Sequence, residues 1–199
     1  MLVLASTSPY RRQLLERLGI PFTTCAPQVD EAVLPNETPA QLVLRLSEAK
    51  ARAGAALMGL QGKMLIIGSD QVADFGGAAV GKPNSFERAR AQLQQLSGKT
   101  VIFRTGLALF NPAARRCCCT RVDVTTTYRK LSDEEIDAYL EKARPLNCAG
   151  AARSEDLGIA LFERIESDDP TALIGLPLIA LTRLLRAEDV NPLLWWRDA

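Results

Sequence analysis

The stretch that most constrains the fold is the first one, LVLASTSPYRRQLLERLG at residues 2–19. Its apolar start predicts a buried strand over 2–5. Ser8 is a residue type that caps helix N-termini, Pro9 suits the first helical position, and the leucines that follow recur on one helix face. The chain therefore begins as a strand, a short turn and a helix, and the turn carries hydroxyl groups beside two arginines.

The remaining chain mixes strand and helix patterns throughout. Strand patterns occupy 22–26, 64–70, 101–110, 119–128 and 159–166, and a hairpin turning on Gly76 and Gly77 is expected over 71–82. Helix patterns begin at Thr38–Pro39, near Phe86, after Ser132 and at Pro177. No connection is long enough to require a second domain, so we expect one mixed α/β domain over residues 1–199.

The chain contains no histidine, and this excludes several classes of site. Ser-His-Asp and Cys-His nucleophile systems and histidine-bearing zinc sites all need the imidazole that is missing. A general base is therefore expected to be a carboxylate, and a metal ion to be a hard cation bound by oxygen.

Charge, hydropathy and cysteine patterns narrow the setting. The net charge of +1 does not favour a general nucleic-acid binder, and no apolar stretch reaches the roughly 20 residues of a membrane span. The apolar start lacks the features of a secretory signal. Five cysteines, three of them consecutive, do not make a disulfide framework and favour a reducing compartment. We therefore expect a cytoplasmic protein that binds neither nucleic acid nor membrane.

The opening turn is a candidate anion site. Backbone N–H groups at a helix N-terminus attract anions, and the guanidinium groups of Arg11 and Arg12 can each bind two phosphate oxygens. The alternative is an ordinary helix start, in which Ser8 caps the helix and both arginines are solvated. On this stretch alone the ordinary start is favoured.

A second phosphate-binding pattern fails. The stretch GGAAVGKP at 76–83 matches the beginning of a P-loop, but Pro83 replaces the Ser or Thr that ligates Mg²⁺. The residue before a proline also avoids helical angles, so Lys82 does not lead into a P-loop helix. Lys82 can still present a point charge from a loop.

Three further residues are candidates for polar chemistry. Asp70 ends an apolar strand pattern, where a carboxylate can hold Mg²⁺, take a proton from water, or only form a turn. Glu31 is a second candidate metal ligand, and a solvated loop charge is the alternative. Lys50 lies on the helix expected after Thr38, where a surface i, i+4 pair is the alternative.

Together these pieces resemble the Maf family of nucleotide pyrophosphatases. Ten stretches occur in that family's order: LASTSPYRRQLLERLG, VDE, LVLRLSEAKA, IIGSDQV, VGKP, LSGKT, LSDEEIDAYL, CAGAARSEDLGI, LFERIE and IGLPL. The resemblance covers nearly the whole chain and is greatest to the 7-methyl-GTP pyrophosphatase branch. It implies a curved central sheet flanked by helices, of the inosine-triphosphate-pyrophosphatase type, with two lobes around one cleft and a homodimeric assembly.

The resemblance also implies a reaction and a set of residues. The reaction is hydrolysis of a nucleoside triphosphate to the monophosphate and pyrophosphate, with a divalent cation such as Mg²⁺ or Mn²⁺. Asp70 falls on the position of the proton acceptor. The family's polar cleft positions are Ser6, Arg11, Arg12, Glu31, Lys50 and Lys82, and the metal is expected at Glu31 and Asp70. Positions that set base choice are Tyr10, Gln71 and Glu155.

Two alternatives stay open at this point. The pyrimidine branch, which hydrolyses dTTP and UTP, usually has threonine after the catalytic aspartate. Gln71 therefore favours the methylated-guanine branch, although Tyr10 stands where that branch commonly has tryptophan. The other alternative is a nucleotide-binding regulator of cell division that does not turn its ligand over, a role associated with the family's name.

Overall fold

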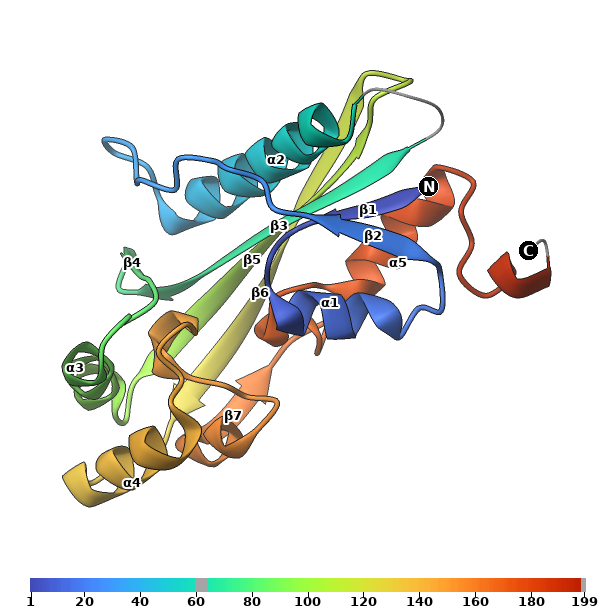
Figure 1. Ribbon diagram of the computed structural model, residues 1–199. Coiled ribbons are helices and arrows are strands. Elements are labelled where there is room, and N and C mark those ends of the chain that lie inside the picture. Colours follow the sequence, from blue (N-terminus) through green and yellow to red (C-terminus); the bar gives the residue numbers. More distant parts are fainter. Residues whose placement is uncertain (60–63, 198–199) are drawn as a thin grey trace.

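The computed structural model describes residues 1–59 and 64–197, which form one mixed sheet with helices on both faces (Figure 1). The strands are β1 (Leu2–Ala5), β2 (Phe22–Cys25), β3 (Leu65–Phe75), β4 (Ala78–Val80), β5 (Thr100–Asn111), β6 (Arg116–Tyr128) and β7 (Phe162–Glu166). The α-helices are α1 (Pro9–Glu16), α2 (Pro39–Met58), α3 (Phe86–Leu96), α4 (Asp133–Ala143) and α5 (Leu178–Ala187). Short 3-10 helices occupy Ala149–Ala151, Leu157–Leu161, Ala172–Ile174 and Trp195–Arg197.

The sheet runs in the order β2-β1-β3-β5-β6-β7, and β4 pairs with the end of β3. β1 is parallel to β2 and β3, while the other pairs are antiparallel. The mixed α/β class expected from the sequence is confirmed. Two local predictions are confirmed as well: Ser8 caps α1, and the β3–β4 hairpin turns on Gly76 and Gly77.

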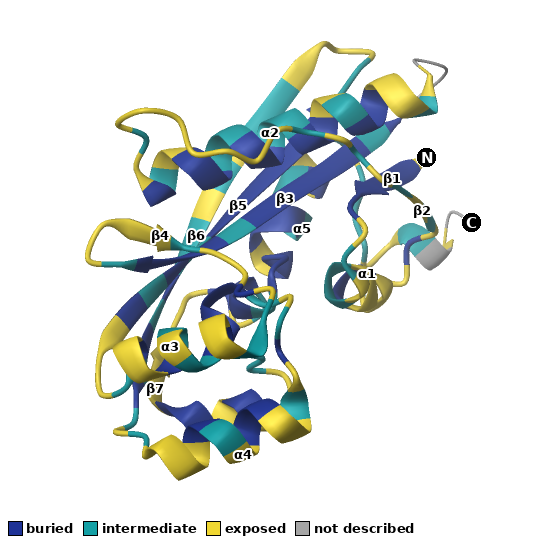
Figure 2. Ribbon diagram, turned by 60° about the vertical axis from the view of Figure 1, so that its left-hand side comes forward, coloured by how far each residue is buried: buried dark blue, intermediate teal, exposed yellow. Residues whose placement is uncertain are grey.

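Successive residues of β3 face opposite sides of the sheet, and each side has its own core. Ile67 packs with the apolar residues of β1, α1 and α5, whereas Ile66 packs with those of α2. A third cluster fills the far end of the sheet, where α3, α4 and the segment before β7 cover the strands. Figure 2 shows β3 and β5 buried along most of their length, with the outer faces of the helices exposed.

α2 approaches the sheet unusually closely, because two neighbouring strands carry glycine beneath it. A Cβ atom on Gly68 of β3 would overlap the carbonyl oxygen of Ser47, and one on Gly106 of β5 would overlap that of Val43. Glycine in a strand often marks such an approach of another backbone. The contact fixes the height of α2 above β3, and with it the position of Lys50.

One expectation about the fold needs correction. The sequence placed Asp70 at the carboxyl end of its strand, but β3 continues to Phe75, so Asp70 lies in its middle. The reason is that residues 71–75 extend the strand into the β4 hairpin. Asp70 does lie just beyond the end of a neighbouring strand, because the last pair between β1 and β3 joins Leu4 to Ile67.

The C-terminal segment folds back onto the domain. Trp195 packs against the core cluster shared by β1, α1 and α5, while residues 198–199 and the Trp196 side chain lie outside what the structure describes. Among the described residues, no helix has both the length and the apolar character needed to cross a membrane.

Candidate active site

A cavity of about 350 Å³ opens at the edge of β3. β1 pairs with β3 as far as Ile67, and β4 pairs with it from Ala73 onward, so residues 68–72 have β5 as their strand neighbour on one side only. Side chains from helices on both faces of the sheet can therefore enter the same cavity at this unpaired section. The lining includes, with others, Ser6, Tyr10, Arg11, Glu31, Lys50, Gln71, Lys82, Cys148, Glu155, Leu173 and Ile174.

Lys50 joins the two acidic candidates. Its Nζ lies 2.6 Å from Glu31 Oε1 and 2.6 Å from Asp70 Oδ1. The Lys50 and Asp70 side chains are both nearly buried, whereas Glu31 is about half exposed. Asp70 is not itself part of the cavity lining and reaches it through Lys50. Two carboxylates thus converge on one cation, from a loop and from a strand far apart in the sequence.

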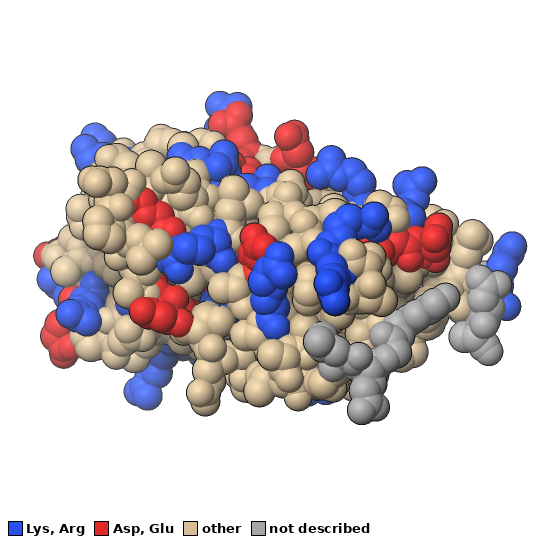
Figure 3. All heavy atoms as spheres, turned by 90° about the horizontal axis from the view of Figure 1, so that it is seen from above, with Lys and Arg blue, Asp and Glu red and all other residues tan. Residues whose placement is uncertain are grey.

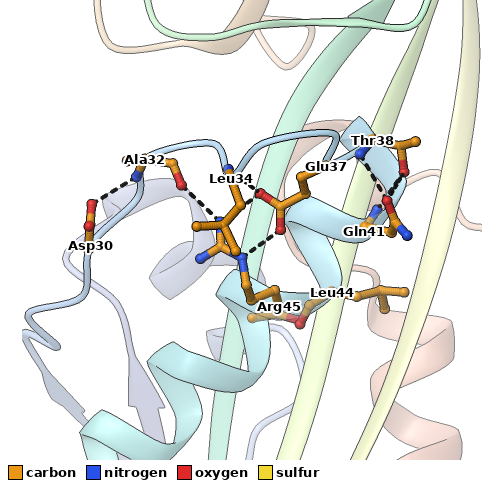
Figure 4. A network of polar contacts seen from close by, with 9 residues as sticks. Asp30, Ala32, Leu34, Glu37, Thr38, Gln41, Leu44 and Arg45 are labelled. Atoms are coloured by element: carbon orange, nitrogen blue, oxygen red, sulfur yellow. Dashed lines mark hydrogen bonds and ion pairs between the residues drawn. The ribbon is translucent and has the colours of Figure 1, made fainter.

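Glu31 lies in the loop between β2 and α2, and a polar network ties that loop to the helix (Figure 4). Arg45 of α2 donates to the carbonyl oxygen of Ala32 at 2.9 Å and pairs with Glu37, which accepts from the backbone N–H of Leu34. Hydrogen bonding from Arg45 lowers the pKa of Glu37 to about 2. The network keeps the residues beside Glu31 in place without using Glu31 itself.

Arg11 enters the cavity from the first turn of α1. Its Nε donates to the carbonyl oxygen of Gly175 at 2.8 Å. Desolvation lowers the pKa of Arg11, while the nearby charges of Asp70 and Glu31 favour its charged form. Ser6 also lines the cavity, and its hydroxyl oxygen accepts a hydrogen bond from the backbone N–H of Ser8. The opening turn therefore starts a helix and also presents a cation to the cavity.

The pKa of Glu31 is affected by the positive charges around it. Burial alone would raise its pKa, but the hydrogen bond and charge of Lys50, with the charges of Lys82 and Arg11, outweigh burial and lower it. Lys82 reaches the cavity from the loop that follows β4. Arg11, Lys50 and Lys82 therefore gather around one carboxylate in the cavity. On the face drawn in Figure 3, by contrast, cationic and anionic side chains are interspersed.

Arg12 is not brought to this group. Its side chain is 65% exposed, pairs with Glu16 one turn along α1 at 3.0 Å, and lies outside the cavity lining. Consecutive helical residues point about 100° apart, so Arg11 and Arg12 do not share a direction. The phosphate-binding role expected for Arg12 stays a prediction.

The other end of the cavity holds the residues expected to set base choice. Tyr10 and Glu155 both line it. Partial burial raises the pKa of Glu155, an effect that the charge of Arg153 opposes. The guanidinium carbon of Arg153 lies 5.5 Å from the centroid of the Tyr10 ring, an arrangement typical of a cation–π contact. Arg153 also donates to Asp156 and to the carbonyl oxygen of Ala143.

Gln71 also lines the cavity, and its amide nitrogen is fully engaged. Nε2 donates toward the carbonyl oxygens of Ala172 and Leu173 at 2.8 and 3.0 Å and toward Thr105 Oγ1 at 3.0 Å. These partners hold the 3-10 helix Ala172–Ile174 against β3, and two residues of this segment line the cavity. Gln71 therefore shapes the pocket wall as well as facing it.

Among the residues that sequence reasoning missed are three that support the site from outside its lining. Arg153, Ser69 and Gly175 touch or support the candidate residues from outside the lining, and none carries a signal by its type alone. Arg153 falls within the matched stretch CAGAARSEDLGI, Ser69 within IIGSDQV and Gly175 within IGLPL. Within the described residues there is no group of three or more Cys, Asp or Glu side chains arranged to hold a metal ion by themselves.

Known proteins are similar to this chain over most of its length. A family model described as Maf-like protein matches residues 1–188. A relative from Burkholderia thailandensis, named 7-methyl-GTP pyrophosphatase, is 53% identical over 94% of this chain and 86% of its own length. One of the same name from Aromatoleum aromaticum is 52% identical over 95% and 96%. A crystal structure of a nucleoside-triphosphatase / dITP/XTP pyrophosphatase from Mycobacterium abscessus covers 72% of this chain and 94% of that chain, at a TM-score of 0.44 and 16% identity.

Proposed function

The chain belongs to the Maf family, and we propose that it is a nucleotide pyrophosphatase that hydrolyses 7-methyl-GTP to 7-methyl-GMP and pyrophosphate. The observation that carries the proposal is the single cavity in which Arg11, Lys50 and Lys82 meet Glu31, with Asp70 joined to it through Lys50. The relatives named for this activity match nearly the whole chain.

The residues fit a divalent cation. Mg²⁺ is usually held by one or two carboxylates together with phosphate oxygens of the substrate. Glu31 and Asp70 provide such a pair, since a carboxylate oxygen of each lies 2.6 Å from Lys50 Nζ; a cation bound between them would displace that ammonium toward the phosphates. When bound, the cation would polarise phosphate oxygens and offset their charge. A cytoplasmic location, which rests on the cysteine pattern, and a homodimer, which rests on the resemblance, remain part of the proposal.

The side chains of the cavity have separate roles in the reaction. A triphosphate carries several negative charges, and attack at the α-phosphorus adds charge to the leaving pyrophosphate. Arg11, Lys50 and Lys82 stabilise that charge from different sides of the cavity, with Ser6 beside them. Arg12 would join them only by leaving Glu16. Asp70 orients the attacking water and takes its proton, a role expected of a carboxylate in a chain without histidine.

At the base end, charge and shape favour 7-methylguanine. Arg153 covers one face of Tyr10, so the base stacks on the part of the ring that lines the cavity. Glu155 accepts hydrogen bonds from the donor groups on the Watson–Crick edge of guanine, and its charge favours a cationic base. Gln71 fixes the wall formed by Leu173 and Ile174.

We expect purified protein to release pyrophosphate from 7-methyl-GTP faster than from GTP, UTP or dTTP at matched concentration, and to stop when EDTA removes the divalent cation. Pyrophosphate release measured for the four nucleotides, with and without Mg²⁺, tests this. Fastest release from UTP or dTTP would place the protein with the pyrimidine enzymes instead. Tight nucleotide binding without release would favour the regulatory alternative.

Replacing Glu155 by Gln should lower the preference for 7-methyl-GTP over UTP about tenfold, because one charge-assisted hydrogen bond to the base is weakened. The measurement is the ratio of kcat/KM values for the two nucleotides. Glu163→Gln, which neutralises an exposed carboxylate on β7, is the matched control and should leave the ratio unchanged. An unchanged ratio in the Glu155 variant would remove this residue from base selection.

A further inference from the structure

The stretch IGLPL, residues 174–178, contains the carbonyl group that accepts a hydrogen bond from Arg11. The Gly175 carbonyl oxygen accepts from Arg11 Nε at 2.8 Å. A guanidinium has five N–H groups, and this bond uses the one on Nε. The two terminal nitrogens are left for an anion, and their direction is set by where the Gly175 carbonyl lies.

That carbonyl is itself fixed. The hydroxyl of Ser69, fully buried on β3, lies 2.8 Å from the Gly175 oxygen and 2.9 Å from the Gly106 oxygen. On the N-terminal side, Gln71 and Thr105 bind the carbonyl oxygen of Ala172. On the C-terminal side, the buried carboxylate of Asp169 accepts from the backbone N–H groups of Ile179 and Ala180 in the first turn of α5. The bond to Arg11 therefore has a rigid base.

The backbone at residue 175 requires glycine. Its φ is +117°, a region that residues with a Cβ rarely adopt. A Cβ placed there would also lie 3.4 Å from Arg11 Nε. A larger residue would have to relax its backbone, and the carbonyl that orients Arg11 would turn with it.

We propose that Gly175 is a positioning residue for the triphosphate, acting through Arg11, with Ser69 as its support. The proposal rests on the proposed function only in taking Arg11 as a phosphate-binding residue. It gives the IGLPL stretch a physical role, which is to orient the guanidinium of Arg11 toward the phosphates.

The test is a double-mutant cycle between Gly175→Ala and Arg11→Lys. Lysine keeps the positive charge of Arg11 but lacks the Nε–H group that donates to the Gly175 carbonyl oxygen. Gly175→Ala alone should raise the KM for 7-methyl-GTP about tenfold, as expected for a lost charge-assisted hydrogen bond, with a smaller change in kcat. In the Arg11→Lys background the same substitution should raise KM no further.

Gly98→Ala is the matched control, because Gly98 also has a positive φ, of +68°, and lies at the end of α3, outside the cavity lining. It should lower the melting temperature while leaving KM unchanged. The proposal is overturned if folded Gly175→Ala protein keeps the wild-type KM, or if its effect on KM is equally large in both backgrounds.

Where Gly175→Ala fails to fold, Ser69→Ala serves instead, since it removes one support of the carbonyl and creates no clash. A rise in KM that disappears with Arg11→Lys supports the proposal, and an unchanged KM contradicts it. Wild-type protein that releases no pyrophosphate would instead contradict the proposed function. In that case the same double-mutant cycle is measured through the Kd for the triphosphate, which still tests the coupling between Gly175 and Arg11.

Discussion

Asp70→Asn is expected to lower kcat for 7-methyl-GTP by about 10³-fold, within the range that a positioned general base contributes. Asparagine keeps the size of the side chain and can still accept from Lys50, but it cannot take a proton from water. Nucleotide binding should persist, because Arg11 and Lys82 are untouched and one negative charge near the triphosphate is removed. Pyrophosphate release and equilibrium nucleotide binding, measured on the same preparation, separate the two effects.

Asp74→Asn is the matched control for that experiment. Asp74 lies on the same strand, is similarly buried, and also pairs with a cation, since its Oδ2 is 2.6 Å from Arg104 Nε. It supports the β4 hairpin by accepting from the backbone N–H of Gly77. The control should lower stability and keep kcat close to the wild-type value. Wild-type pyrophosphate release by Asp70→Asn would refute the role of Asp70 as the base.

The second large effect is expected at Gly68. Alanine there would push a methyl group into the backbone of α2, 2.6 Å from the amide nitrogen of Ala51 and closer still to the carbonyl oxygen of Ser47. Because backbone atoms cannot turn aside as side chains do, the helix itself must move. We expect a loss of about 3 kcal/mol in the free energy of unfolding, at the upper end for overpacking a core.

Urea unfolding monitored by circular dichroism measures this change. Gly81→Ala is the control, because a Cβ at Gly81 meets nothing within 4 Å. Its unfolding midpoint should stay close to that of the wild type. A Gly68→Ala midpoint equal to that of the control would show that α2 does not rest on the strand as tightly as described. Folded Gly68→Ala protein should also bind triphosphate more weakly, since moving α2 carries Lys50 away from Asp70.

Features with local causes could be predicted from the sequence. Ser8 caps α1, Thr38 and Ser132 form capping boxes, and Gly76 and Gly77 turn a hairpin, because each depends on neighbours a few residues away. Arg11, Glu31, Lys50 and Lys82 could be named as candidates from the residues themselves, but the resemblance was needed to bring them into one site. Spacing alone left Lys50 and Glu31 as surface charges.

The remaining features depend on contacts between distant segments. The distance between Lys50 and Asp70 is set by the two glycines under α2, and no pattern along the chain reports that. The direction of Arg11 is set by a carbonyl 164 residues away. The sequence also treated Arg11 and Arg12 as equivalent, whereas the helix separates neighbours by about 100° and brings only Arg11 to the cavity.

The interrupted pairing of β3 has one more consequence. A bare strand edge normally invites a strand from another molecule, which is a route to aggregation. Here the bare section, residues 68–72, is short and recessed between the end of β1 and the start of β4. Another polypeptide cannot dock along so brief a notch, yet a small molecule can enter it. Most of this section is buried, and Gln71 is its one residue in the described cavity lining, so the interruption opens room for a ligand without exposing a strand edge to other chains.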